Sequence, residues 1–228
     1  MIGEEIRASV FRDTTTLYHT MPEEAVAKQL IKFTQKYAGK SILDLGCATG
    51  NYSVVLKSLG YEMKGADVNA AYIARARERG IDAFQITDGV PLPDKCVDTV
   101  ICFEVIEHVP DLHSLITEAK RLARKKILFT TPNSEHVEQL MQNGLLYEHF
   151  AELDHKNFFT IHSLTEVLSK YFTKVHVQKG DGINPFALFG FTPIRMLGKV
   201  LTKVGIIRPK YHFRLFAVCN ISENNADH

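Results

Sequence analysis

Two short stretches of this sequence combine side chains that can bind a ligand and move a proton. The first is a glycine-containing turn, Asp44-Leu-Gly-Cys-Ala-Thr-Gly50, and a further carboxylate, Asp67, follows it. The second is Glu104-Val-Ile-Glu-His108, where the i, i+3 and i+4 spacing places the two glutamates and the histidine on one face of a helical turn. Glycines admit a ligand close to the backbone, whereas carboxylates and imidazole transfer protons or hold a metal ion. We therefore expect a binding turn and, beside it, a reactive cluster.

The turn lacks both of the usual phosphate-binding patterns, G-x-G-x-x-G and G-x-x-x-x-G-K. A carboxylate at Asp44 would repel a pyrophosphate, but it suits a ligand whose near end is an ammonium or a sulfonium. Asp67, at the end of the next predicted strand, can accept hydrogen bonds from both hydroxyls of a ribose. Adenosine with a positively charged tail is S-adenosylmethionine. In the alternative reading, Gly46 and Gly50 only end a strand and begin a helix, and Asp67 caps the next helix.

Strands and helices alternate around these stretches. Apolar runs predict strands at 41–45, 61–67, 83–86, 97–103, 126–131, 174–178 and 213–220, and helical spacing predicts helices at 22–37, 51–59, 70–79, 111–122 and 164–170. This alternation predicts an α/β fold, a Rossmann-like, seven-stranded and mostly parallel sheet with helices on both faces. Such a sheet binds its ligand at the carboxyl ends of the strands, where both stretches fall.

Length and composition predict one domain over residues 1–228, with an N-terminal helical cap at 1–39 and insertions at 132–161 and 182–212. Hydrophobic residues make up 45% and charged residues 23%, which excludes a disordered or disulfide-stapled chain. The 27 basic and 26 acidic residues give no bulk charge that would favour a polyanionic partner. Four cysteines without C-x-x-C spacing and an amino terminus without an apolar stretch predict a cytoplasmic protein with reduced thiols. No apolar run reaches the roughly 20 residues of a membrane span, so peripheral contact is the only membrane association left open.

At these residues the chain resembles the class I S-adenosylmethionine-dependent methyltransferases. The first motif of that family looks like Leu43–Asn51, and four further matches follow in order: Gly65–Asp67, Leu92–Asp98, Val100–Val109 and Thr130–Asn133. The resemblance covers roughly residues 40–178, and Ala48-Thr49 stands where a third glycine is usual. It implies S-adenosylmethionine as the cofactor, with Gly46 and Cys47 on its methionine part, Asp67 on the ribose, Asp88 or Gly89 at the adenine amino group and Phe103 packed nearby. The implied cofactor-binding set is Asp44, Gly46, Cys47, Gly50, Asp67, Val68, Asp88, Gly89 and Phe103, although Asp88 also fits an ordinary turn aspartate.

The same resemblance implies that Glu104 and His108 lie beside the transferable methyl group as catalytic residues. Two metal-dependent branches carry Glu-x-x-Glu-His there: the 2′-O-methyltransferases of small-RNA 3′ ends and the O-methyltransferases of ubiquinone synthesis. The small-RNA branch adds a histidine from a later insertion, which His155 matches. The implied ligands of a divalent ion such as Mg or Mn are then Glu104, Glu107, His108 and His155. Without an ion, His108 would act as the general base, and the pattern also occurs in members not known to bind metal. His149 is an additional candidate.

We expect methyl transfer from S-adenosylmethionine to an oxygen of a small or lipid-like molecule. The alternatives are a metal-dependent RNA 2′-O-methyltransferase and a non-catalytic module that binds the cofactor; a nucleotide-dependent oxidoreductase is disfavoured because the fingerprint glycines are missing. The insertion at 182–212 is amphipathic and basic, which fits a cap over a hydrophobic substrate, contact with an anionic membrane or contact with a nucleic-acid backbone. It also fits a helical lid that joins the core or a dimer interface. The acceptor and the oligomeric state stay open.

Overall fold

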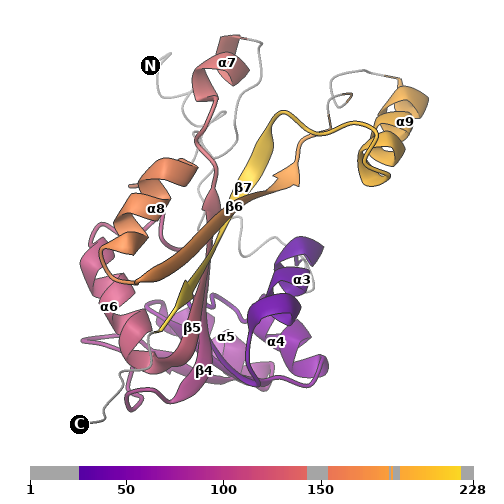
Figure 1. The fold of residues 1–228 in the computed structure, drawn as a ribbon. Helices are drawn as coiled ribbons and strands as arrows, with labels where there is room; N and C mark the ends of the chain where they lie inside the picture. Colours follow the sequence, from indigo (N-terminus) through magenta and orange to yellow (C-terminus); the bar gives the residue numbers. More distant parts are fainter. Residues whose placement is uncertain (1–25, 143–153, 185, 187–190, 222–228) are drawn as a thin grey trace, which may run out of the picture.

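The computed structural model describes residues 26–142, 154–184, 186 and 191–221. Its centre is a seven-stranded sheet in the order β3-β2-β1-β4-β5-β7-β6, in which only β7 runs antiparallel to its neighbours (Figure 1). The strands are β1 (Ser41–Leu45), β2 (Glu62–Asp67), β3 (Asp82–Gln85), β4 (Val97–Phe103), β5 (Ala123–Pro132), β6 (Lys174–Gly182) and β7 (His212–Asn220). The predicted Rossmann-like fold is confirmed.

Helices cover both faces of the sheet. The described helices are α3 (Lys28–Tyr37), α4 (Asn51–Ser58), α5 (Ala70–Glu78), α6 (Leu112–Leu122), α7 (Val137–Gln142), α8 (Ile161–Ser169) and α9 (Thr192–Lys203). Side chains of α3, α4 and α5 bury one face, and those of α6 and α8 bury the other. Every residue of β4 is buried, because this strand lies mid-sheet between the two layers. No described helix has both the length and the apolar character that crossing a bilayer requires.

The predicted elements form close to their expected bounds. β1 and β4 match their predictions, whereas β5 begins three residues earlier than predicted and β6 continues to Gly182. Both extensions carry charged or glycine residues, which interrupt the apolar pattern used to predict strands. The first predicted helix is seen from Lys28 onward. Its earlier part to residue 25, and His149, lie outside the described residues.

Polar side chains fix where three of the helices begin. The Asn69 side chain accepts hydrogen bonds from two backbone N–H groups of α5, so Asn69 rather than Asp67 caps that helix. Asp111 caps α6, and Thr160 forms a capping box with Ser163 at α8. Each cap contributes about 1 kcal/mol, because it satisfies N–H groups that have no partner inside the helix. The capping alternative for Asp67 is therefore wrong.

Asp98 joins three strands at the edge of the sheet opposite the binding turn. Its carboxylate accepts hydrogen bonds from the N–H groups of Lys40 and Ser41 at the start of β1 and pairs with Arg124 and Lys125 of β5. Burial alone would raise the pKa of Asp98, but these donors outweigh it and lower the pKa to about 2. The residue holds β1, β4 and β5 in register at their amino ends.

Candidate active site

A cavity of about 960 Å³ opens at the carboxyl edge of the sheet, beside β1 and β4. The chain runs from β1 outward to β2 and from β4 outward to β5, so β1 and β4 flank the point where the strand order reverses. Open α/β sheets bind ligands in the crevice at such a switch point. The walls of the cavity come from the loops that follow β1, β2, β3 and β4, together with α6.

Gly46 brings the loop after β1 against the cavity. Its φ of +85° is left-handed, and a Cβ at this position would lie 2.4 Å from a methyl carbon of Val105, which also lines the cavity. Any side chain at residue 46 would therefore clash with the loop after β4. Gly46 and Ala48 present backbone to the cavity, as a close-approach turn requires.

Asp67 ties the loops after β1 and β2 together at the cavity wall. One carboxylate oxygen accepts a hydrogen bond from the N–H of Ala48 at 2.9 Å, and the other accepts from the N–H of Asn69 at 2.9 Å. These contacts fix the direction of the carboxylate, and each oxygen keeps a second lone pair for a ligand hydroxyl. The position suits the expected contact with a ribose.

Asp88 and Gly89, the residues expected at the adenine amino group, both line the cavity, and so does Val68 of the expected cofactor set. Val68 is 70% exposed, which is unusual for a branched apolar side chain and leaves it able to cover a flat ring. Sequence reasoning missed Tyr72, which lines the same wall one turn into α5. The loop itself is held by Glu118, whose carboxylate accepts the N–H of Val90 at 2.8 Å.

Three residues of the expected cofactor set lie behind the loop and do not line the cavity. Asp44 is buried and accepts a hydrogen bond from the hydroxyl of Ser53 at 2.8 Å. Burial, opposed by the Ser53 hydrogen bond and aided by the charge of Asp67, raises the pKa of Asp44 to about 7. The thiol of Cys47 packs into the core beneath α5, and Gly50 begins α4 with a φ of +82°. These residues shape the turn from inside.

The structure places Phe103 differently from the expectation. Along β4, Phe103 shares a face with Ile101, and that face is covered by α3 and α4. Its ring packs edge-on against Tyr52 at 5.6 Å between centroids and does not line the cavity. The period of two along a strand sends residue 103 into the core, so the next two residues, Glu104 and Val105, line the cavity instead.

Glu104 begins the loop after β4 in a strained conformation. Its φ is +54°, and its carboxylate accepts hydrogen bonds from the Thr130 hydroxyl at 2.8 Å and from Nε of Arg214 at 2.9 Å. Arg214 also pairs with Asp181 of β6. Burial would lower the pKa of Arg214, but the two carboxylates outweigh it and raise the pKa. Glu104 is thus neutralised by a buried guanidinium while it lines the cavity.

This conformation breaks the helical face expected for Glu104, Glu107 and His108. With this left-handed φ, Glu104 lies outside the right-handed helical region, and its side chain pairs with Arg214 instead of sharing a helical face with the other two. In the described part of the chain, the group with metal-ligand geometry consists of Glu107, His108 and His155. The expected four-residue ligand set is therefore assembled only in part.

His108 lines the cavity and contacts a carboxylate. Its Nδ1 lies 3.1 Å from Oδ2 of Asp154, which lines the same wall. Asp154 belongs to the segment before α8, and sequence reasoning missed it, although its place beside His155 was a usable signal. A carboxylate at one ring nitrogen orients an imidazole and stabilises its protonated form. His108 and Asp154 have the arrangement of a general base and its orienting acid.

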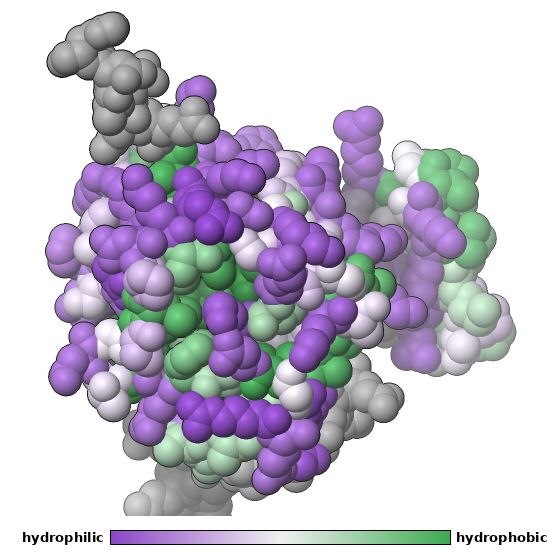
Figure 2. All heavy atoms as spheres, turned by 90° about the horizontal axis from the view of Figure 1, so that it is seen from below, coloured by the Kyte–Doolittle hydropathy of each residue, from purple (hydrophilic) through white to green (hydrophobic). Residues whose placement is uncertain are grey.

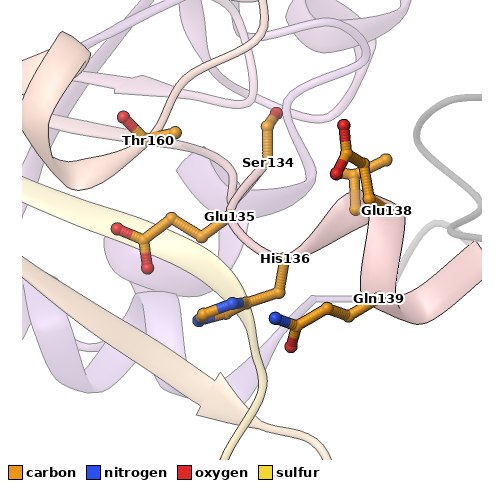
Figure 3. A pocket seen from close by; sticks show the side chains of 7 residues that line it. Ser134, Glu135, His136, Glu138, Gln139 and Thr160 are labelled. Atoms are coloured by element: carbon orange, nitrogen blue, oxygen red, sulfur yellow. The ribbon is translucent and has the colours of Figure 1, made fainter.

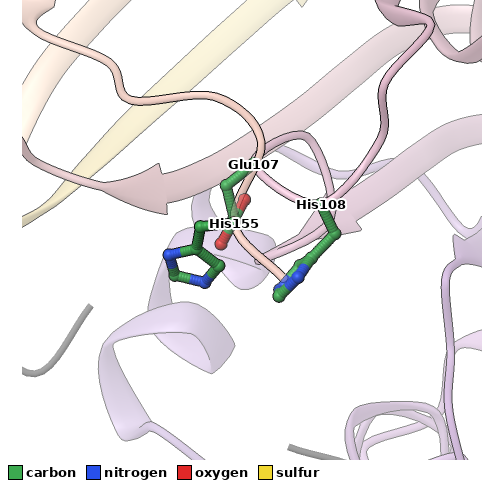
Figure 4. A group of neighbouring side chains, drawn as sticks. All are labelled: Glu107, His108 and His155. Atoms are coloured by element: carbon green, nitrogen blue, oxygen red, sulfur yellow. The ribbon is translucent and has the colours of Figure 1, made fainter. Parts of the chain in front are cut away.

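Glu107 and His155 form a buried cluster with His108, in which the carboxylate lies between the two imidazoles (Figure 4). The ligand atoms of the three side chains all lie within 4.8 Å of one another, and the rings of His108 and His155 meet edge-on at 4.6 Å. Asn157 holds the two segments together by donating to the carbonyls of Ile106 and Val109. Neither Glu107 nor His155 lines the cavity.

A second, smaller pocket of about 580 Å³ lies between the end of β5 and α7 (Figure 3), and it shares no lining residue with the first cavity. Its lining residues include Glu135, His136 and Glu138. The carboxylate of Glu135 is paired with Lys179 of β6. No residue of the expected cofactor or metal sets lines this pocket, so the cavity beside β1 and β4 is the candidate active site.

A family model for a methyltransferase domain matches residues 18–176, which include every loop of this cavity. The chain belongs to the class I S-adenosylmethionine-dependent methyltransferases. The predicted resemblance is confirmed, and the family implies S-adenosylmethionine as the cofactor of the cavity. In this chain the turn after β1, Asp67 at the end of β2 and the loop after β4 all line one cavity.

Two curated relatives of this methyltransferase carry the name O-methyltransferase. A ubiquinone biosynthesis O-methyltransferase of Pseudomonas aeruginosa is 33% identical over 130 residues, which cover 47% of this chain and 56% of that protein. A malonyl-[acyl-carrier protein] O-methyltransferase of Yersinia pestis is 31% identical over 121 residues, covering 50% of this chain and 45% of that protein. The chain spans about half the length of the curated relatives it matches.

Solved structures share the fold of this methyltransferase. A SAM-dependent methyltransferase from Archaeoglobus fulgidus superimposes with a TM-score of 0.67 at 18% identity, covering 91% of this chain and all of that one. A possible histamine N-methyltransferase from Thermotoga maritima superimposes with a TM-score of 0.60 at 19% identity, covering 85% of this chain and 86% of that one. At these identities the likeness extends to the fold alone.

Proposed function

We propose that this methyltransferase transfers the methyl group of S-adenosylmethionine to an oxygen of a small or lipid-like acceptor, with His108 as the general base. One observation carries the proposal: His108, oriented by Asp154, lines the same cavity as the cofactor loops. A hydroxyl becomes a strong nucleophile toward a sulfonium when a nearby base removes its proton. The two curated relatives named above, both O-methyltransferases, support oxygen as the acceptor atom.

In this proposal, each residue around the cavity has a role that follows from its position. Asp67 holds the ribose, and the backbone at Gly46 holds the methionine part, so the methyl group is directed along the loop after β4. Glu104, clamped by Arg214, fixes that loop, and His108 takes the proton of the acceptor. Holding two reactants in line is the main contribution of a transferase, because the cofactor itself supplies the electrophile.

The cluster of Glu107, His108 and His155 supports a second candidate, transfer assisted by a divalent ion. One buried carboxylate and two imidazoles within 4.8 Å are donors that suit Mn²⁺, Fe²⁺ or Zn²⁺ better than Mg²⁺, which prefers oxygen ligands. Such an ion would lower the pKa of an acceptor hydroxyl. On this candidate, the three side chains hold the ion at the rim of the cavity. An RNA 2′-hydroxyl is then the alternative acceptor.

The test is formation of S-adenosylhomocysteine with three acceptor classes: catechol-like phenols, acyl carboxylates and RNA 3′ ends. We expect His108→Gln to reduce kcat by about 10²-fold or more with any accepted substrate, as loss of a general base does. Binding of S-adenosylhomocysteine, measured by calorimetry, should stay within about twofold, because His108 does not hold the cofactor. His162→Gln, at an exposed histidine of α8, is the matched control.

Metal titration separates the two candidates. Tight Mn²⁺ binding that is lost in Glu107→Gln and His155→Ala, together with activity that requires the ion, would establish the second candidate. Unchanged turnover in His108→Gln would refute both, since both place His108 at the reacting atoms. Cofactor binding without turnover of any acceptor would favour the non-catalytic module.

A further inference from the structure

The hairpin of β6 and β7 carries an arm, residues 183–211, that projects from the rest of the molecule (Figure 1). Its neck is closed by a hydrogen bond from the N–H of Ile183 to the carbonyl of Tyr211 at 2.9 Å, next to the last strand pair, Gly182 with His212. β6 runs in the same direction as β5, so the arm extends beyond the carboxyl edge of the sheet, where the cofactor cavity also opens. The helix of the arm is α9.

One narrow side of α9 packs against the arm itself. Gly198 is the buried residue of this helix, and a Cβ there would lie 2.4 Å from Phe186 and 2.5 Å from Asn184. The side chain of Asn184 also donates to the carbonyl of Arg195. These contacts fix which side of α9 faces inward and leave the opposite side in solvent.

The outward side of α9 is apolar. Among the described residues, nine large hydrophobic side chains are exposed, and six of them belong to this arm: Phe191, Met196, Leu197, Val200, Val204 and Ile206. Their exposed fractions run from 54% to 71%. Figure 2 shows these hydrophobic side chains on the outer side of the lobe that stands apart from the body. Single exposed apolar residues are ordinary, but a grouped set on one helix face marks a contact surface.

The arm is also basic throughout. It carries Arg195, Lys199, Lys203, Arg208 and Lys210, and no Asp or Glu occurs between Asp181 and Glu223. All five cations are exposed. Because the whole chain has a net charge of only +1, the rest of the molecule is acidic and the positive charge is concentrated on the arm. Lys199 and Lys203, one helical turn apart, lie on the flank beside Met196.

We propose that this arm docks the methyltransferase on an anionic membrane surface, with the outer face of α9 between the lipid chains and the flanking cations on the head groups. A helix with one apolar face and a purely basic flank has the physical form of an interfacial helix. A nucleic acid would be bound by the cations alone and would leave the aliphatic face in water. A second copy, paired through the same face, would bring ten cations together with no acid between them.

The docking goes beyond the proposed methyl transfer and does not depend on it. The arm extends from the same edge of the sheet at which the cavity opens, so docking would hold that edge near the membrane. A lipid-like acceptor would then reach the cavity without crossing much water. Binding to vesicles is measured without any acceptor, so the docking and the methyl-transfer proposal fail or succeed separately.

The experiment is flotation of the full chain with two kinds of vesicle, phosphatidylcholine alone and phosphatidylcholine with about one-third phosphatidylglycerol. We expect the chain to float with the anionic vesicles and not with the neutral ones, and raised salt should release it. Each cation at an anionic surface strengthens binding roughly fivefold, so Lys199→Glu with Lys203→Glu should weaken partitioning at least about 25-fold. Leu197→Ser with Val200→Ser should weaken it about tenfold or more.

Matched controls distinguish an effect of the arm from a general effect of the charge or hydrophobicity of the chain. Lys28→Glu with Lys32→Glu makes the same change at the same spacing on α3, where both lysines are exposed. Leu59→Ser removes an exposed apolar side chain after α4. Both controls should float like the parent chain.

Three results would overturn the docking. The first is absence of flotation with anionic vesicles, and the second is flotation that the arm variants and the controls share equally. The third is a stable dimer in sedimentation equilibrium that Leu197→Ser with Val200→Ser dissolves, which would assign the face to a second copy. Equal thermal unfolding of all variants shows that the arm changes leave the domain folded, since none of these side chains is buried.

Discussion

Replacing Asp44 with asparagine tests the electrostatics at the base of the binding turn. The carboxyl of Asp44 is buried, and its pKa is raised from an ordinary value of 3.8 to about 7. The folded protein therefore holds a proton at this site that the unfolded chain releases near pH 4. Between about pH 4 and pH 7, folding must take up this proton from solution, so the free energy of unfolding of the parent chain falls as the pH rises through that window.

The size of the loss follows from the pKa. A shift of about three units at 1.36 kcal/mol each corresponds to about 4 kcal/mol of unfolding free energy at pH 8, as an order of magnitude. Asparagine keeps the shape of the side chain, its oxygen can accept the hydrogen bond from Ser53, and it does not titrate. Burying the amide N–H groups of asparagine without hydrogen-bond partners lowers the unfolding free energy by about 1–3 kcal/mol, but this loss does not vary with pH.

The assay is urea unfolding of the parent and of Asp44→Asn at pH values between 4.5 and 8.5. We expect the unfolding free energy of Asp44→Asn, relative to that of the parent, to increase as the pH rises and to become constant above pH 7. All other titrating groups are common to both chains, so the difference isolates Asp44. A difference that stays constant across this range would refute the reasoning. Affinity for the cationic cofactor should fall in the same variant above pH 7, where the carboxyl of Asp44 is ionised in the parent chain.

Three further substitutions test other parts of the site and its frame. Gly46→Ala should weaken binding of S-adenosylhomocysteine at least about tenfold in calorimetry, since the new methyl group would clash with Val105 at a left-handed φ. Asp98→Asn should lower the unfolding free energy at pH 7 by about 2 kcal/mol. The pKa of Asp98 is lowered to about 2, so the parent chain loses this advantage when the carboxylate is protonated. In urea unfolding at a series of acidic pH values, the difference in unfolding free energy between the parent and Asp98→Asn should therefore shrink as the pH falls from about 4 toward 2. Arg214→Met should destabilise the fold by about 3 kcal/mol in urea, and adding Glu104→Gln should recover part of the loss, because the unpaired carboxylate is then removed.

Each of these expectations has a result that contradicts it. Unchanged cofactor affinity in Gly46→Ala would mean that the loop after β4 yields to the extra methyl group. A deficit in Asp98→Asn that is independent of pH would locate its cause in packing. Additive losses in the Arg214 and Glu104 double variant would show that the two side chains do not act as a pair.

The framework of the site was predictable from local patterns. β1 and β4 are central strands buried on both faces, so they appear in sequence as unbroken apolar runs, and glycine with aspartate marks the turns after them. The positions of Gly46 and Asp67 at the cavity followed from that alternation, whereas those of Asp88 and His108 were implied by the family resemblance. Their side chains, or their backbone at the glycine, line the cavity because the loops that bear them end neighbouring parallel strands.

Side-chain partners from distant parts of the chain were not predictable. The expectation for Glu104 failed because Arg214, 110 residues further on, captures its carboxylate and the backbone turns left-handed. Phe103 was assigned to the cavity, although the pleat of β4 directs it into the core. Asp154 reaches His108 because hydrogen bonds from Lys156 and Asn157 tie the two loops together. Contacts of this kind depend on tertiary packing, so sequence spacing does not show which side chains will pair.

Because the arm joins the sheet through a narrow neck, the arm can be replaced without changing the sheet. The two ends of the arm meet at adjacent residues of a continuous β-hairpin, so a tight two-residue turn in place of residues 183–211 would leave the register of β6 and β7 unchanged. The cost of closing so long a loop grows only slowly with its length, so arms of very different size could be grafted at this point without rebuilding the catalytic sheet. With this architecture, a methyltransferase can gain or lose a membrane-binding arm while the cofactor site stays unchanged.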